Sequence, residues 1–202
     1  MATLDLSLSF ALASLVVELT PGPNMAWLAL LAATEGRRRG LAAVAGVATG
    51  LAVMGAAAAF GLAALVQAQP LVYQALRWAG LGYLMWLGYQ AWTGADREEG
   101  GPMGLSAWRY FRQGVITNVL NPKAAVFFVT VLPSFLPTNA SLMQNLEFSA
   151  IYVVVATAVH AAIVVAAGAT HAAMSNPARV TLARRVMALA LVGVAVWLFL
   201  KS

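Results

Sequence analysis

The sequence has 202 residues, of which 61% are hydrophobic and 9% are charged, and it contains no cysteine. A water-soluble domain cannot hide so much apolar surface, and the lack of cysteine excludes disulfides, thiolate metal sites and thiol chemistry. The net charge of +5 comes from short basic clusters at the ends of apolar runs, so we expect no nucleic-acid partner. The composition predicts an integral membrane protein that spans a lipid bilayer.

Apolar runs long enough to cross a bilayer recur along the whole chain. In chain order they predict six transmembrane helices, at about residues 6–33, 41–68, 71–91, 115–136, 146–169 and 186–200. A polar, glycine-rich segment at about residues 93–103 separates two halves of three spans, about 1–92 and 104–202. We therefore expect a single all-α transmembrane domain over residues 1–202, with the polar segment as a cytoplasmic loop.

Basic residues are concentrated in three of the predicted loops. The other side of the membrane receives almost none, so the positive-inside rule places these loops in the cytoplasm and both termini outside. Amphipathic rings near the same boundary are predicted membrane anchors. The basic residues are Arg37, Arg38, Arg39, Arg97, Arg109, Arg112, Arg179, Arg184 and Arg185, and the anchors are Trp92, Trp108 and Tyr110.

Proline motifs interrupt the first and fourth spans. Proline removes a backbone donor and leaves carbonyls that hydrocarbon cannot satisfy, so such breaks persist where protein, water or ligand meets them. The second three spans enter the membrane from the opposite side, and paired breaks favour two inverted three-helix repeats around a substrate site. The predicted substrate-binding residues are Thr20, Pro21, Gly22, Pro23 and Asn24 in the first span and Asn118, Asn121, Pro122 and Lys123 in the fourth.

A simpler interpretation of either motif remains open, because a single intramembrane proline is often only a kink. Two motifs at corresponding positions, each with an asparagine, favour a site instead. A half-helix that begins near Asn24 would direct its N-terminal amides at an anion such as a carboxylate. Asn118 lies about one turn before Asn121 and would share the cavity face.

Glu18 and Lys123 are the charges deepest within the apolar runs. At about 1.5 Å per helical residue, Glu18 lies roughly 18 Å from the outer end of the first span and Lys123 roughly 15 Å from the inner end of the fourth. Two interpretations stay open. The residues form an ion pair that makes their burial tolerable, or Lys123 binds a substrate carboxylate while Glu18 binds an amino group or a transported proton.

His160 lies in the fifth span, one turn after Thr157. A histidine inside a helix either packs through a hydrogen bond or carries a proton. Glu18 and His160 are therefore the candidates for proton coupling. In the second span the small residues Ala42, Gly46 and Gly50 allow another helix to approach closely. The pattern leaves open whether that helix belongs to the same chain or to a homodimer partner.

Four segments carry a resemblance to the LysE superfamily and specifically to the RhtB-type amino-acid exporters: TPGPNM, EGRRRGLAAVAGVATG, LRWAGLGYLMWLGYQAW and FRQGVITNVLNPKAAVFF. The resemblance implies a bacterial inner-membrane protein with periplasmic termini. It implies export of small zwitterionic amino acids or close derivatives, such as threonine, homoserine or its lactone, leucine or lysine, driven by protons. Glu18 stands where relatives commonly carry an apolar residue.

Alternating access with proton antiport is the expected mechanism, without a cofactor. A cation or metal exporter or channel is the alternative, but it needs several carboxylate, histidine or cysteine ligands, and only Glu18 and His160 are available to converge on one site. An enzyme is not expected, because Asp5 and Asp96 lie outside the spans and no serine is evidently paired with His160.

Overall fold

The computed structural model describes residues 2–20, 22–61, 70–93, 103–137 and 139–171, with separate positions between 178 and 196. Pro21, most of the predicted loop at 93–103 and much of the sixth predicted span at 186–200 lie outside the described residues.

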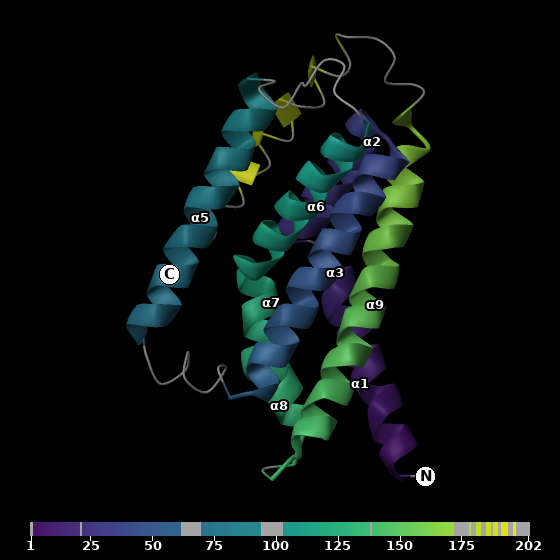
Figure 1. Cartoon of the computed structure of the whole chain (residues 1–202), viewed down its shortest axis with the longest axis vertical. Coiled ribbons are helices and arrows are strands. Elements are labelled where there is room, and N and C mark those ends of the chain that lie inside the picture. Colours follow the sequence, from purple (N-terminus) through teal and green to yellow (C-terminus); the bar gives the residue numbers. More distant parts are fainter. Residues whose placement is uncertain are drawn as a thin grey trace.

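Over the described residues the chain is all-helical, which confirms the predicted class (Figure 1). In chain order the elements are α1 (Ala2–Leu19), α2 (Pro23–Glu35), α3 (Arg37–Ala59), α5 (Pro70–Thr93), α6 (Met103–Val119), α7 (Pro122–Val126), the π-helical turn η1 (Phe127–Val131), α8 (Leu132–Phe135) and α9 (Leu142–Gly168).

The helices break at both proline motifs, as predicted. Asp5–Leu19 and Pro23–Glu35 meet at an angle of 65°, and Ala107–Val119 and Pro122–Phe135 meet at 49°. Pro23 and Pro122 each stand at the start of a new helix, where the missing N–H costs nothing and the fixed φ suits the first turn. Each bent pair is apolar and long enough to cross a membrane together, as α3 and α9 are singly.

Two predicted boundaries were wrong. The fourth span was placed at 115–136, but α6 begins at Met103, so Arg109 and Arg112 belong to a helix and not to a loop. Polar residues at the start of α6 concealed this extension from a search for apolar runs. The second span was extended to residue 68, but α3 ends at Ala59, close to Gly61, which has a φ of 85°. That left-handed conformation favours glycine and ends the helix.

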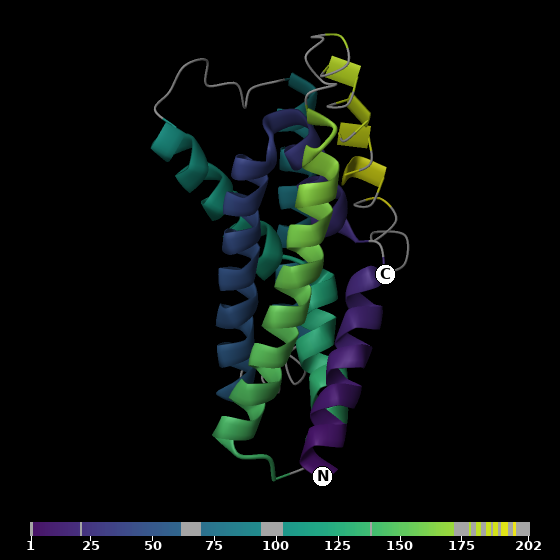
Figure 2. The same ribbon diagram turned by 90° about the vertical axis from the view of Figure 1, so that its right-hand side faces the viewer.

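The bent pair α1–α2, α5 and α9 run in one direction along the bundle, and α3 and the bent segment α6–α8 run in the other (Figure 1). α3 packs chiefly against α6 and α9, while α5 stands to one side next to α6 (Figure 1). α1 lies along α9, with the N-terminal ends of both helices at the same end of the bundle (Figure 2). The bundle therefore brings the breaks after α1 and α6 into its interior.

α1 has the polarity of a helix that faces lipid. Beyond Asp5 and Ser9 near its N-terminal end, its exposed positions are apolar, including Leu8 and Val16, whereas Ser14 and Glu18 are buried on the side toward α9. A soluble helix has the reverse pattern, with apolar residues inside. Buried polar residues behind an apolar outer surface are typical of a helix that lines a site within a membrane bundle.

The close contact between α3 and α6 depends on glycine. A Cβ atom on Gly46 would collide with the carbonyl of Phe111, and one on Gly114 would collide with the carbonyl of Ala43. Gly50 likewise lies against Asn118. The small residues of the second span therefore allow α6 of the same chain to pack closely against α3. This pattern gives no support for a homodimer.

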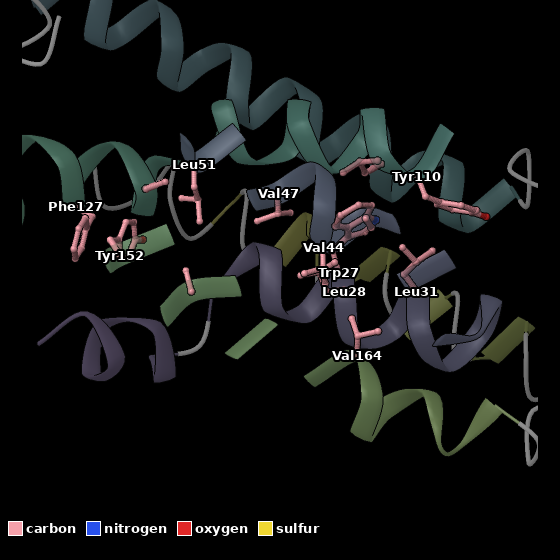
Figure 3. Packing of buried hydrophobic residues seen from close by; sticks show 14 of the residues in the cluster. Trp27, Leu28, Leu31, Val44, Val47, Leu51, Tyr110, Phe127, Tyr152 and Val164 are labelled. Atoms are coloured by element: carbon pink, nitrogen blue, oxygen red, sulfur yellow. The ribbon is translucent and has the colours of Figure 1, made fainter. Parts of the chain in front are cut away.

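The apolar core surrounds α3 and includes one residue that was predicted elsewhere (Figure 3). Tyr110 is only 5% exposed and packs in this core, so its assignment as a membrane anchor was wrong. Its position on α6 turns the ring toward the bundle. Trp92 and Trp108 are 53% and 57% exposed and remain available as anchors.

Candidate functional site

The two helix breaks meet inside the bundle. The Nζ atom of Lys123, just after the second break, donates a hydrogen bond of 3.0 Å to the carbonyl of Thr20 at the first break. The polar side chains gathered there, here called the central polar cluster, come from α1, α2, α6, α7, α9 and the second break. They are Glu18, Asn24, Asn118, Asn121, Lys123, Tyr152 and His160.

The carboxylate of Glu18 contacts three other side chains of the central polar cluster. Its Oε1 atom accepts a hydrogen bond of 2.7 Å from the hydroxyl of Tyr152. Its Oε2 atom lies 3.3 Å from Nε2 of His160 and 3.7 Å from Nζ of Lys123. The ion pair with Lys123 that the sequence left open is therefore present, and the carboxylate, 3% exposed, has three partners.

Helical spacing brings these groups together. On α1, Phe10, Ser14 and Glu18 are buried at intervals of four residues and form one stripe. On α9, Tyr152 and His160 are two turns apart on the buried face. Residues four or eight apart share a helix face, so side-by-side packing of α1 and α9 brings Glu18, Tyr152 and His160 together.

Three asparagines occupy the rest of the site. Nδ2 of Asn24 donates to Oδ1 of Asn118 over 3.0 Å and joins α2 to α6. Oδ1 of Asn24 has no partner among the described residues and remains available as an acceptor. Asn121 has a structural role as well, because its side chain accepts from the backbone N–H of Lys123 and caps α7.

The remaining predicted residues shape the first break. The Thr20 hydroxyl donates to the carbonyl of Val16 in its own helix, so Thr20 meets Lys123 through its backbone carbonyl. Gly22 is extended, and a Cβ atom there would lie 3.3 Å from Cδ of Lys123. The glycine thus leaves room for the lysine stem. No structural role follows for Pro21, which lies outside the described residues.

His160 is 3% exposed and approaches Glu18 through Nε2. Its Nδ1 atom has no hydrogen-bond partner within the described part of the chain, and neither has the hydroxyl of Thr157. Buried polar atoms are normally paired. His160 therefore meets the Glu18 carboxylate through one ring nitrogen, while the other ring nitrogen is left without a partner among the described residues.

Sequence reasoning missed Tyr152. The residue looked like part of an apolar span, but it lies two turns before His160, and that spacing was the available signal. Its ring stacks on Phe127 with a centroid distance of 3.5 Å and an interplanar angle of 11°. Phe127 belongs to η1, and π-helical turns are frequent at functional sites. Tyr152 therefore links the carboxylate of Glu18 to the irregular part of the broken helix.

The central polar cluster surrounds a small cavity, which Met25 and Leu51 also line. Its volume is about 10 Å³, about enough for a single water molecule. The helices are thus closed around the site in this conformation. A ligand the size of an amino acid requires them to move apart.

The arrangement suits a small ligand with both charges. A buried carboxylate and a partly buried ammonium lie next to an amide oxygen without a partner among the described residues, and the two charges can meet opposite ends of a zwitterion. Within the described ranges there is no group of three or more His, Cys, Asp or Glu side chains that could hold a metal ion. Glu18 and His160 are two candidate ligands, fewer than a typical cation site uses.

Comparisons with known proteins agree with the sequence resemblance. A family model described as LysE type translocator matches residues 15–202. The chain is 31% identical over 150 residues to a homoserine/homoserine lactone efflux protein of Salmonella typhimurium, covering 73% of each chain. It is 27% identical over 157 residues to a threonine efflux protein of Escherichia coli K12, covering 75% of this chain and 76% of that one. It is also 29% identical over 136 residues to a leucine efflux protein of Klebsiella pneumoniae, covering 66% and 64%. No solved structure matches the chain.

Proposed function

Since the chain belongs to the LysE type translocator family, we propose that it exports amino acids or close derivatives from the cytoplasm. Members of this family are translocators, so the chain is not an enzyme. The relatives named for efflux of homoserine, threonine and leucine support this substrate class. The observation that carries the proposal is the ion pair between the buried Glu18 and the partly buried Lys123 at the meeting point of two helix breaks.

Lys123 binds the carboxylate of the substrate, and Glu18 binds its amino group. In the closed conformation these two side chains partner each other at 3.7 Å. A zwitterion inserted between them replaces one ion pair with two and leaves the net charge unchanged. This matters because an uncompensated charge is costly in a low-dielectric interior. Asn24, with its unpaired Oδ1, and Asn118 supply hydrogen bonds beside the pair.

Alternating access follows from the paired breaks. The bent helices α1–α2 and α6–α8 are the first helices of the two halves, 1–92 and 104–202. We assign these halves as inverted repeats within one six-span domain. Rocking of one half against the other exposes the central polar cluster first to the cytoplasm and then to the outside. The protein lies in the bacterial inner membrane with both termini in the periplasm.

Proton antiport follows from competition for one carboxylate. The substrate amino group and a proton both neutralise Glu18, and they cannot do so together. Outside, a proton replaces the departing substrate. Inside, the proton leaves and the next substrate binds. His160, whose Nε2 atom lies 3.3 Å from the carboxylate, passes the proton to and from Glu18.

Inside-out vesicles that contain the protein test the proposal directly. We expect accumulation of one or a few labelled amino acids, dependent on an imposed pH gradient and abolished by Lys123→Ala. Arg112→Ala, at an exposed position on α6, is the matched control and should transport normally. Near-normal transport by folded Lys123→Ala protein would refute the role of Lys123. If vesicles that hold folded wild-type protein accumulated none of the amino acids, the proposed substrate class would be refuted, and divalent cations would be tested next.

A further inference from the structure

The ammonium group of Lys123 lies at the C-terminal end of α1. Nζ donates to the Thr20 carbonyl over 3.0 Å and lies 3.7 Å from Oε2 of Glu18. The last carbonyls of a helix lack partners within the helix and carry partial negative charge, so they favour cations. The break after Leu19 therefore creates a place where a carbonyl, a helix end and a carboxylate all attract one positive group.

We propose that the Thr20 carbonyl and the Glu18 carboxylate form a binding site for a primary ammonium group, and that Lys123 occupies this site when neither a substrate nor a transported proton neutralises Glu18. This inference rests on the proposed function in one respect: the group that displaces Lys123 during transport is the amino group of the substrate. Lys123 is then a tethered substitute for the substrate, and its ammonium must leave before the substrate can enter.

The geometry of Glu18 fits an acceptor that is held in place for an incoming cation. The hydroxyl of Tyr152 occupies Oε1 at 2.7 Å, so the carboxylate is oriented with Oε2 toward Lys123. His160 approaches the same Oε2 atom from α9. Hydrogen bonds that involve an ionised group are directional and strong. The subsite therefore selects a cation that carries N–H groups.

Lys123 is suited to leave. Its side chain is 20% exposed, compared with 4% for Glu18, and its ammonium donates a hydrogen bond to a backbone carbonyl, that of Thr20, with Glu18 farther away at 3.7 Å. A lysine stem is long and flexible, and no side chain at Gly22 obstructs it. Glu18, in contrast, is held by two side chains of α9. An exchange at this subsite moves the lysine and leaves the carboxylate in place.

The exchange also explains selection for zwitterions. A zwitterion that displaces Lys123 offers its carboxylate to the released ammonium. A simple amine takes the site but leaves the Lys123 charge without a partner, which is strongly unfavourable in a buried environment. Lys123 thus discriminates against amines by an unpaired charge, a form of specificity that acts against the wrong ligand.

Binding of small ions to purified full-length protein tests the subsite without transport. The probes are n-propylammonium and tetramethylammonium, which has no N–H group. Thermal unfolding is followed for the wild type, for Lys123→Ala and for the double variant Lys123→Ala with Glu18→Gln. We expect n-propylammonium to stabilise Lys123→Ala with a half-saturating concentration at least about tenfold below that for the wild type, as one charge-assisted hydrogen bond provides. Tetramethylammonium should have no effect, and the double variant should lose the response.

Three results would each overturn the subsite. The wild type and Lys123→Ala could respond equally to n-propylammonium, neither protein could respond to it, or the two cations could stabilise Lys123→Ala equally. Should Lys123→Ala not yield folded protein, Lys123→Met keeps the aliphatic stem and serves in the same comparison. The outcome is independent of the vesicle assay. Ammonium binding without amino-acid transport would keep the subsite and refute the exporter, while transport without ammonium binding would do the reverse.

Discussion

Replacing Tyr152 with Phe tests how the bundle tolerates a buried carboxylate. The variant removes the hydroxyl that donates to Oε1 of Glu18 over 2.7 Å and keeps the ring that stacks on Phe127. Tyr152 is 1% exposed and Glu18 is 3% exposed, so bulk water cannot replace the lost donor. The effect of the substitution is thereby confined to one hydrogen bond to one ionised group.

The magnitude follows from the type of bond. A hydrogen bond to a charged group contributes about 1.5–3 kcal/mol, more than a bond between neutral groups. For a chain of this size, such a loss lowers the thermal midpoint by roughly 2–4 °C per kcal/mol. We therefore expect Tyr152→Phe to unfold about 3–12 °C below the wild type.

Thermal unfolding in detergent provides the measurement, and Tyr89→Phe is the control. Tyr89 lies on α5 and is 65% exposed, so the same chemical change there should leave the midpoint near that of the wild type. If Tyr152→Phe unfolded within a degree or two of Tyr89→Phe, the hydroxyl would not stabilise the Glu18 carboxylate, and the reasoning would be wrong.

Three further substitutions test other parts of the structure. Glu18→Gln should remove most of the stimulation of transport by a pH gradient. The control Glu147→Gln, at an exposed position on α9, should keep that stimulation. An unchanged pH dependence of efflux in Glu18→Gln would show that the Glu18 carboxylate takes no part in proton coupling. Gly46→Ala forces α3 away from the α6 backbone and should destabilise the protein by about 1–3 kcal/mol, measured by thermal unfolding. The control Gly82→Ala adds a methyl group that meets no atom within 4 Å, so its unfolding midpoint should equal or slightly exceed that of the wild type. Asn118→Ala leaves a buried donor on its α2 partner and should cost about 1–3 kcal/mol; wild-type stability together with wild-type half-saturation for substrate would show that the amide pair is dispensable.

The positions of the helix breaks could be predicted because their cause is local. Pro23 and Pro122 lack a backbone N–H in any fold of the chain, so each must begin a helix or distort one. The cost of burying Glu18 and Lys123 in an apolar run is equally independent of the fold, which is why a site near the breaks could be proposed from the residues alone.

Helix faces were harder to predict, because they depend on rotation about each axis. Tyr110 was assigned to the membrane boundary from its place in the chain, but the rotation of α6 turns it into the core. Tyr152 was overlooked for the converse reason, since only its spacing of two turns from His160 marks it within an apolar span. Both outcomes depend on which helices become neighbours.

The sequence by itself determined an all-helical chain, the two breaks and the polar residues around them, since proline geometry and the cost of charge in hydrocarbon act within a few residues. Only the tertiary structure decided what those residues meet. Asn24 and Asn118 are 94 positions apart, and Tyr152 and Glu18 are 134 positions apart. Their contacts exist because glycines let α3 and α6 pack closely while α1 lies along α9. Packing over such separations depends on the shapes of whole helices, and it turns two kinked spans into one site.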